Sequence, residues 1–363
     1  LKELEIDTKG EFGGLGIRIG LRDDWLTVES PMEDTPAFRA GIKSGDRIVE
    51  IDGKSTEGFT TEEAVKKLRG PKGTSVTIKI SRKGEKDLLT FTIIRDIIRL
   101  DSVRGKILTD SIGYLRITEF REKTADDLEQ ALLKLQKEGM KYIILDLRYN
   151  PGGLLKSAVS VSDLFIPADK VIVSTRGRAP GQDSVYKSTD RKIKFIDYPM
   201  AVLVNEGSAS AAEIVAGAMQ DWKRGIIIGP KGKRTFGKGS VQSVMELDYN
   251  CGLRLTTAKY YTPSGKSIHR TSSENTTGGI EPDIGVDISP EVELAVMAKG
   301  TLGDLKVPRV RVENDKVITE KEMVEDVELV QAINILKASD YFRHPNADVG
   351  NNHPSIASDT TKK

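Results

Sequence analysis

The pattern of apolar residues changes near residue 96, and this change constrains the fold more than any other feature. From about Gly10 to Arg95, short segments such as Val76–Ile80 and Leu89–Ile93 alternate apolar and polar residues, which is the period of half-buried strands. From about Ile97 onward, short apolar segments alternate with amphipathic helical ones, which favours a layered α/β domain. A chain of 363 residues is also too long for one ordinary core. The sequence therefore predicts two or three domains of different architecture.

Helices and strands can be assigned to both regions from periodicity alone. The first region is expected to hold one short amphipathic helix, Thr61–Leu68, beside its strands. In the second region the expected strands are Ile112–Ile117, Tyr142–Leu147, Met200–Val204 and Ile226–Ile228, and the expected helices are Thr124–Glu138, Leu154–Leu164, Ala211–Met219 and Glu325–Lys337. The last stretch, Ala338–Lys363, is polar and without period, so it is expected to be a flexible tail.

Charge and cysteine content narrow the classes of function. The chain has 55 basic and 54 acidic side chains, so no excess of cations is present to neutralise nucleic-acid phosphates. Cys251 is the only cysteine, which excludes an intrachain disulfide framework, a cysteine-rich zinc site and a Cys-x-x-Cys redox motif. The apolar runs are too short to span a bilayer, and the charged start of the chain lacks the apolar core of a signal peptide. A start at Leu1 indicates a processed chain or a trimmed fragment.

Histidine is scarce, and this limits the bases that a hydrolase of this sequence could use. His344 and His353 lie in the expected tail, so only His269 could complete a Ser-His-Asp triad. The sequence has no Gly-x-Ser-x-Gly elbow and no His-Glu-x-x-His zinc motif. Lysine can replace histidine, because an apolar pocket lowers its ordinary pKa of about 10.4 and leaves a neutral amine that can deprotonate a serine. Such a site needs a serine at the start of a buried helix and a lysine within a tight glycine segment.

A serine and a lysine of this kind are present. Ser210 follows a buried strand and a turn and precedes a helix, whose N-terminal N–H groups and dipole favour an oxyanion. Lys238 lies in Thr235-Phe-Gly-Lys-Gly-Ser-Val-Gln, where small neighbours allow close approach of its amine. Each feature also has a plainer interpretation. Ser208 could be the helix N-cap or a competing nucleophile, and an isolated Gly-Lys-Gly is most often a surface turn.

The first region contains a run of motifs that resembles a PDZ domain. Gly13-Gly-Leu-Gly-Ile17 is followed by Ala40-Gly-Ile-x-x-Gly-Asp-x-Ile-x-x-Ile-Asp-Gly53, a run that is specific for the type found in bacterial proteases. The resemblance implies that a loop receives the terminal carboxylate of a peptide, which lies as an added strand beside Gly16–Gly20 with its last side chain in a pocket partly made by Thr61–Leu68. Arg69 could pair with a substrate carboxylate or simply be a solvated surface side chain. The implied substrate-binding residues are Gly14, Leu15, Gly16, Ile17 and Arg69.

The second region resembles the carboxyl-terminal processing peptidases, also called tail-specific proteases. Three signatures occur in the family's order: Leu145-Asp-Leu-Arg-Tyr-Asn-Pro-Gly-Gly153, the Ser208-Ala-Ser-Ala-Ala-Glu213 block, and the segment around Lys238. The resemblance implies a Ser-Lys dyad of Ser210 as nucleophile and Lys238 as general base. Further implied site residues are Gln242 to orient the lysine, the N–H groups of Gly153 and Ala211 as oxyanion hole, an acidic position at Asp221, and Thr235 as a weaker candidate for holding the lysine.

These resemblances together imply the fold and the activity. The expected fold is an α/β (α+β) serine-protease core of the crotonase/ClpP-like type, with a PDZ domain inserted into it or placed before it. The expected boundaries are 1–10 for an N-terminal linker or strand, 11–95 for the PDZ domain, 96–340 for the protease core and 341–363 for the tail. The expected function is endoproteolytic cleavage of proteins recognised by their C-terminal tails.

The resemblance also bears on cofactors, partners and compartment. No metal or organic cofactor is expected. The expected partners are protein or peptide substrates, and no nucleic acid is expected to bind. An activating adaptor and a homo-oligomer are both possible. The expected location is the periplasm or another extracytoplasmic compartment.

Three other functions remain to be weighed against this one. The first is a non-catalytic peptide-binding adaptor that uses only the PDZ domain. The second is a serine protease that depends on His269. The third, an ATP-binding P-loop at Gly232–Gly239, is disfavoured because Gly239 replaces the hydroxyl residue and the alternating segment Ser240–Met245 predicts a strand where a P-loop opens a helix.

Overall fold

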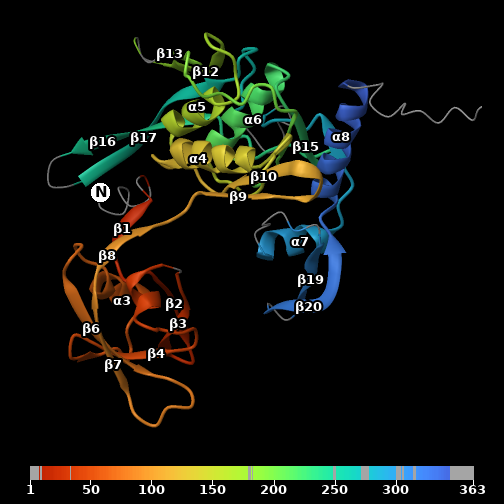
Figure 1. Ribbon diagram of the computed structural model, residues 1–363. Helices are drawn as coiled ribbons and strands as arrows, with labels where there is room; N and C mark the ends of the chain where they lie inside the picture. Colours follow the sequence, from red (N-terminus) through yellow and green to blue (C-terminus); the bar gives the residue numbers. More distant parts are fainter. Residues whose placement is uncertain are drawn as a thin grey trace, which may run out of the picture. The chain divides into compact units, whose positions relative to one another are not determined.

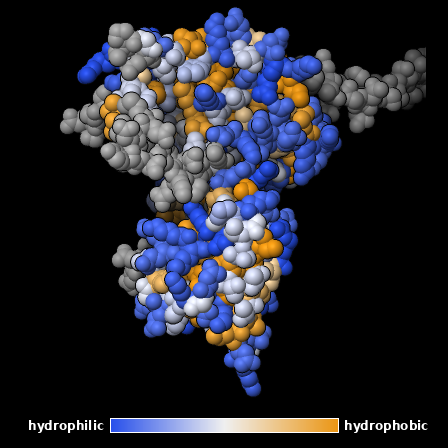
Figure 2. Space-filling view, turned by 90° about the vertical axis from the view of Figure 1, so that its left-hand side faces the viewer, coloured by the Kyte–Doolittle hydropathy of each residue, from blue (hydrophilic) through white to orange (hydrophobic). Residues whose placement is uncertain are grey.

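The computed structural model describes residues 8, 10–32, 34–178, 181, 183–247, 251–270, 278–299, 304, 306–313 and 316–343. The chain divides into two compact units, Leu1–Asp101 and Ser102–Lys363. Within the described residues, no helix has both the length and the apolar character needed to cross a membrane. Figure 2 shows one face of the molecule, where hydrophobic side chains form small patches between hydrophilic ones.

The first unit is built around one antiparallel sheet. The strands run in the order β2-β3-β4-β6-β7, with β5 paired to β4, so β2 is an edge strand. The strands are β2 (Ile17–Arg22), β3 (Trp25–Pro31), β4 (Arg47–Ile51), β5 (Lys54–Ser55), β6 (Ser75–Ser81) and β7 (Leu89–Ile94), and the helices are α2 (Pro36–Arg39) and α3 (Thr61–Leu68). A separate antiparallel pair joins β1 (Glu11–Gly14) to β8 (Asp96–Arg99), so the unit continues past residue 95.

The predicted elements of the first unit are confirmed. Both alternating segments are strands, β6 and β7, and they pair as neighbours. Alternate residues of β6, including Val76 and Ile78, are buried in the core of the unit. Helix α3 begins with a capping box, in which Thr60 and Glu63 each satisfy an N–H of the other, and this explains why the helix starts at Thr61.

The second unit contains a six-stranded sheet with helices on both faces. The strand order is β18-β15-β14-β11-β10-β9, and all neighbours are parallel except β9 and β10. The strands are β9 (Val103–Ile107), β10 (Ile112–Ile117), β11 (Tyr142–Asp146), β14 (Met200–Leu203), β15 (Ile226–Pro230) and β18 (Ile284–Val286), and the turn η1 (Thr109–Ser111) precedes β10. Figure 1 shows α4 (Thr124–Lys137), α5 (Leu155–Asp163) and α6 (Ala211–Asp221) together, away from α8 (Val327–Arg343).

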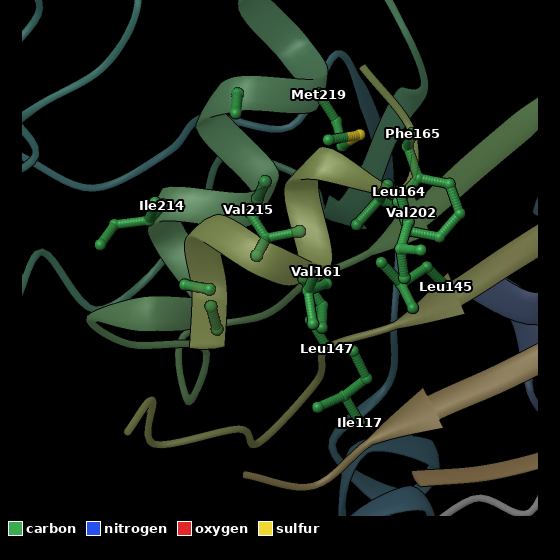
Figure 3. Close-up of a cluster of buried hydrophobic side chains, with 14 of the residues drawn as sticks. Ile117, Leu145, Leu147, Val161, Leu164, Phe165, Val202, Ile214, Val215 and Met219 are labelled. Carbon is green, nitrogen blue, oxygen red and sulfur yellow. The ribbon is translucent and has the colours of Figure 1, made fainter. Parts of the chain in front are cut away.

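The buried strands of this sheet send alternate side chains into two different cores. Leu145 and Val202 pack with Val161 of α5 and Val215 of α6 (Figure 3). Their neighbours on the strands, such as Ile144, face the opposite core, which α8 covers. Parallel strands that are covered on both faces read as continuous apolar runs, which is why Tyr142–Asp146 is apolar until its last residue.

Several further elements complete the second unit. A four-stranded antiparallel sheet has the order β13-β12-β17-β16. Its strands are β12 (Val171–Gly177), β13 (Ser184–Lys187), β16 (Ser240–Leu247) and β17 (Cys251–Tyr261). The chain then forms α7 (Pro290–Lys299) and the hairpin of β19 (Lys306–Glu313) and β20 (Lys316–Glu325).

The sequence located the main elements of the second unit but placed its last helix imperfectly. The four expected strands correspond to β10, β11, β14 and β15, and the expected helices correspond to α4, α5, α6 and α8. The strand that the alternation predicts after Gly239 is confirmed as β16. Helix α8 starts after Asp326 and continues to Arg343, so residues 338–343 are helical rather than part of a tail, while residues 344–363 lie outside the described ranges.

Candidate active site

Ser210 lies in a strained turn between β14 and α6. Its backbone has φ 54° and ψ −113°, a combination that is costly for a residue with a side chain and that persists only where the surroundings hold it. The residue is 9% exposed, so it remains just accessible at the N-terminus of α6. The next residue, Ala211, is the first of the helix, and its N–H donates to no acceptor in the described part of the chain.

Ser208, the competing serine, uses its hydroxyl inside the same turn. Its side chain is fully buried. The Oγ donates to the carbonyl of Leu147 at 2.8 Å and accepts the N–H of Asn205 at 2.9 Å. These bonds join the turn to the segment after β11, so the Ser208 hydroxyl has a structural role, whereas Ser210 keeps 9% of its surface exposed.

A glycine loop, residues 147–153, follows β11 and lies against the Ser210 turn. Asn150 fixes its shape, because its Oδ1 accepts the N–H of Gly152 and its carbonyl accepts the N–H of Ala209. A Cβ on Gly152 would lie 2.7 Å from the Cβ of Ser210, and both Gly152 and Gly153 have positive φ. Only glycine allows this approach. The N–H of Gly153 is unused among the described residues.

Glu213 connects the Ser210 turn to the segment that carries Lys238. The carboxylate is fully buried and accepts four hydrogen bonds. Its Oε2 receives the backbone N–H groups of Ser210 and Lys238, each at 2.8 Å. Its Oε1 receives the Thr235 hydroxyl at 2.6 Å and the Gly237 N–H at 2.7 Å. Burial raises the pKa of Glu213, and these four hydrogen bonds act in the opposite direction.

The glycines beside Lys238 are required by the close packing of the chain. Gly237 has φ 86°, and a Cβ on Gly239 would lie 2.3 Å from the backbone nitrogen of His269. Lys238 is half-buried, and no carboxylate of the described residues forms an ion pair with its ammonium group. Gly-Lys-Gly is therefore a packed segment rather than a surface turn.

The other predicted site residues lie at different distances from Ser210 and Lys238. Thr235 is fully buried, and its hydroxyl donates to Glu213, which also binds the backbone of Ser210 and Lys238. Gln242 is exposed on β16, opposite Thr256 and beside a bulge. Asp221 lies at the far end of α6, about 16 Å along the helix axis from Ser210. Its Oδ2 accepts the N–H of Ser264 at 2.8 Å, which gives it a local role in closing a turn.

Among the described residues, His269 has no carboxylate partner of the kind that a catalytic histidine needs. Its Nδ1 is buried without a hydrogen-bond partner, so no described carboxylate orients the ring. Burial lowers its pKa, and Lys259 lowers it further. Within the described residues, no group of three or more acidic, histidine or cysteine side chains is placed to hold a metal ion.

A buried charge cluster beneath the glycine loop is a feature that the sequence analysis missed. Arg148 is fully buried and contacts Asp146 together with Asp326 and Glu328, which come from the start of α8. Burial alone would raise the pKa of Asp146, but Arg148 and Arg116 outweigh it and lower the pKa to about 2. Glu213 was also missed, although Ser-x-x-Glu at a helix start is a known capping pattern.

The predicted carboxylate-binding loop of the first unit lies between β1 and β2. Gly16 has φ 76°, and a Cβ there would lie 2.3 Å from Thr35, so glycine is required. The buried Leu15 carbonyl accepts the N–H of Ala37 at 2.9 Å, which ties the loop to α2. Arg69, at the end of α3, stacks on the ring of Phe12 at 4.5 Å.

Comparisons with known proteins identify the domains and the family of this chain. The model for the PDZ domain matches residues 3–81, and the model for peptidase family S41 matches residues 111–286, so the PDZ match lies before the peptidase match in this chain. The chain is 44% identical over 353 residues to a carboxy-terminal-processing protease of Bartonella bacilliformis, which covers 93% of this chain and 77% of that protein.

Two further relatives cover less of the chain. The carboxy-terminal processing protease CtpA of Bacillus subtilis is 36% identical over 81% of this chain, which spans 60% of its length. The structure of a photosystem II D1 C-terminal processing protease is 29% identical over 77% of this chain and 73% of that one, with a TM-score of 0.44. On the identity and coverage of the Bartonella relative, the chain belongs to peptidase family S41, the carboxy-terminal-processing serine proteases.

Proposed function

We propose that this chain is a serine endopeptidase with a Ser210–Lys238 dyad and that it cleaves proteins captured by their C-terminal tails. The observation that carries the dyad is the carboxylate of Glu213. Its Oε2 accepts the N–H groups of Ser210 and Lys238. The two backbone nitrogens therefore lie within about 6 Å of each other. A serine and a lysine side chain that start so close together can share a proton.

The proposed reaction follows the chemistry of these groups. Lys238, as the neutral amine, takes the proton of the Ser210 hydroxyl while Oγ bonds to the scissile carbonyl carbon. The oxyanion accepts the N–H groups of Gly153 and Ala211, which have no other acceptor among the described residues. The C–N bond then breaks, and the leaving amine takes the proton from the lysine. Water releases the acyl group, again with Lys238 as base.

The proposed capture of tails rests on the geometry of the first unit. Strand β2 is at the edge of its sheet, and α3 packs beside it. An extended peptide could therefore add to β2 and place its last side chain near the apolar residues Ile17, Ile19 and Leu68. We further propose that the enzyme works outside the cytoplasm, which cell fractionation with an antibody to the chain would test.

The dyad is tested by cleavage of a tailed test protein, followed by mass spectrometry. Ser210→Ala and Lys238→Ala should each abolish cleavage, whereas the exposed controls Ser184→Ala and Lys233→Ala should cleave like the wild type. Cleavage by Lys238→Ala at the wild-type rate would reject the lysine as base. Binding without any cleavage by the wild type would instead support the adaptor.

Tail capture is tested with peptides rather than with variants. A fluorescent peptide with an apolar C-terminal residue should bind, and the same peptide with an amidated C-terminus should bind at least about tenfold more weakly, because the carboxylate is lost. Equal affinity for both peptides would reject recognition of the terminus.

A further inference from the structure

Arg148 joins the glycine loop to a part of the chain almost 180 residues later. Its guanidinium is fully buried, and its two terminal nitrogens each donate to a different oxygen of Asp326 at 2.8 Å. One of them also donates to Glu328 at 2.8 Å. The planar guanidinium fits this bidentate arrangement, which fixes orientation as well as distance. The second residue of the glycine loop is therefore held in one geometry by the start of α8 together with Asp146 of β11, which accepts from the same guanidinium at 2.7 Å.

Asp326 also determines where α8 begins. Its Oδ1 accepts the N–H of Leu329 at 3.2 Å, and its carbonyl accepts the N–H of Val330 at 2.9 Å, as at a helix N-cap. The apolar face of α8, including Leu329 and Leu336, packs on the buried side of the sheet. Docking of the helix on the sheet thus places the Asp326 carboxylate against Arg148.

The next residue of the loop, Tyr149, is held by the same part of the chain. Its backbone has φ 57°, which costs energy for a residue with a side chain. Its side chain packs beside Ala295 and Val296 of α7. Its N–H donates to Asn205 at 2.9 Å, on the Ser210 side. Two consecutive loop residues, Arg148 and Tyr149, therefore contact the C-terminal segment, residues 290–343, and Tyr149 is also bonded to Asn205 near the Ser210 turn.

We propose that Asp326 is a positioning residue for the reaction: through Arg148 it holds the glycine loop so that the Gly153 N–H points at the oxyanion. This inference rests on the proposed function. Only three residues separate Arg148 from Gly152, which lies against Ser210. A displacement of the Arg148 backbone should therefore also displace the Gly153 N–H. Catalysis then depends on docking of the start of α8 against the glycine loop.

The test compares Asp326→Asn with Asp304→Asn in the full chain. Asparagine retains an oxygen for the helix cap but loses one of the two bonds to Arg148. The control Asp304 belongs to the same part of the chain and forms a partly exposed ion pair with Lys106. We expect Asp326→Asn to lower kcat about 10- to 100-fold, in the range of a weakened oxyanion donor, with KM within about twofold. The control should match the wild type.

A second readout separates positioning from a general structural defect. A peptide boronic acid forms a tetrahedral adduct with the serine, so its affinity should fall in parallel with kcat in Asp326→Asn, while PDZ binding of the tail peptide stays constant. Unchanged kcat and boronate affinity would overturn the inference and leave the proposed function intact. Failure of the wild type to cleave by means of Ser210 would instead reject the proposed function.

Arg148→Lys offers an independent test if Asp326→Asn does not fold. Lysine keeps the buried positive charge, but it cannot form the bidentate contact with Asp326. The same pattern is expected: lower kcat, weaker boronate binding and an unchanged KM. Wild-type kcat and boronate affinity in Arg148→Lys would also overturn the inference.

Discussion

Glu213→Gln is the most informative single substitution at the candidate active site. The carboxylate accepts two donors on each oxygen, and all four donors are N–H or O–H groups. Glutamine has the same shape, but one of its two polar atoms is an NH₂ group that cannot accept. In either orientation of the amide, two of the four donors lose their acceptor and face another donor.

The cost can be worked out from this count. A buried polar group that loses its partner costs about 1–3 kcal/mol, so two such groups cost about 2–6 kcal/mol. A domain of ordinary stability, about 5–15 kcal/mol, would remain folded in most of this range. The structural result would be separation of two of the segments that Glu213 connects, and the Ser210–Lys238 pair would lose its common anchor.

Urea unfolding measures this cost in the second unit alone. The chain has two tryptophans, and Trp222 lies in the second unit. In a Trp25→Phe background its fluorescence reports that unit. Glu213→Gln should lower the free energy of unfolding by about 2–6 kcal/mol and reduce cleavage at least about tenfold.

The matched control is Glu206→Gln, since Glu206 is partly exposed and forms an ion pair with Lys233. Its effect should stay within about 0.5 kcal/mol. A Glu213→Gln protein that unfolds and cleaves like the wild type would show that the shared carboxylate holds neither segment.

Three further predictions follow from buried groups. Burial raises the pKa of Glu328 to about 7, above its ordinary 4.5, so as the pH rises this side chain ionises in the unfolded chain before it ionises in the folded one. The contribution of Glu328 to the free energy of unfolding should therefore fall by about 3 kcal/mol between pH 4.5 and 7. Urea titrations at several pH values should show this fall in the wild type and a flatter pH dependence in Glu328→Gln. Gly152→Ala should abolish cleavage, measured on the tailed protein, because its Cβ would collide with Ser210. Gly16→Ala should prevent tail-peptide binding, measured by fluorescence anisotropy, and lower the melting temperature of the first unit, because its Cβ would overlap Thr35.

Local signals explain why much of the fold could be predicted from the sequence. The apolar runs of β11 and β14 and the capping box before α3 act over a few residues, so their spacing is visible in the sequence. The glycines of the site can be recognised in the sequence for the same reason, because each stands at a position where another segment packs too closely for a side chain. The distinction between Ser208 and Ser210 was not visible, since it depends on a hydrogen bond to Leu147 in another segment.

The charge cluster could not have been predicted in this way. Arg148 and Asp326 are separated by more than half of the second unit in sequence, and neither stands in a pattern that marks it as buried. Charged residues are normally found at the protein surface. A buried charged residue is paired with an opposite charge, and the periodicity of the sequence cannot show where in the chain that partner lies. Helix α7, with an apolar face turned to Tyr149, depends on the same long-range packing.

The sheet topology explains why the three parts of the site meet. The glycine loop follows β11, Ser210 follows β14 and Lys238 follows β15, and these strands are parallel neighbours with β14 in the middle. The carboxyl ends of parallel strands lie on one edge of a sheet, where sites of α/β proteins form. Ser210 is therefore flanked by the glycine loop on one side and by the segment that carries Lys238 on the other. Glu213 joins the Lys238 segment to the Ser210 turn through hydrogen bonds, and Arg148 joins the glycine loop to the start of α8. The two flanks thus depend on different buried carboxylates, so Glu213→Gln should act through the segment that carries Lys238, whereas Asp326→Asn should act through the glycine loop.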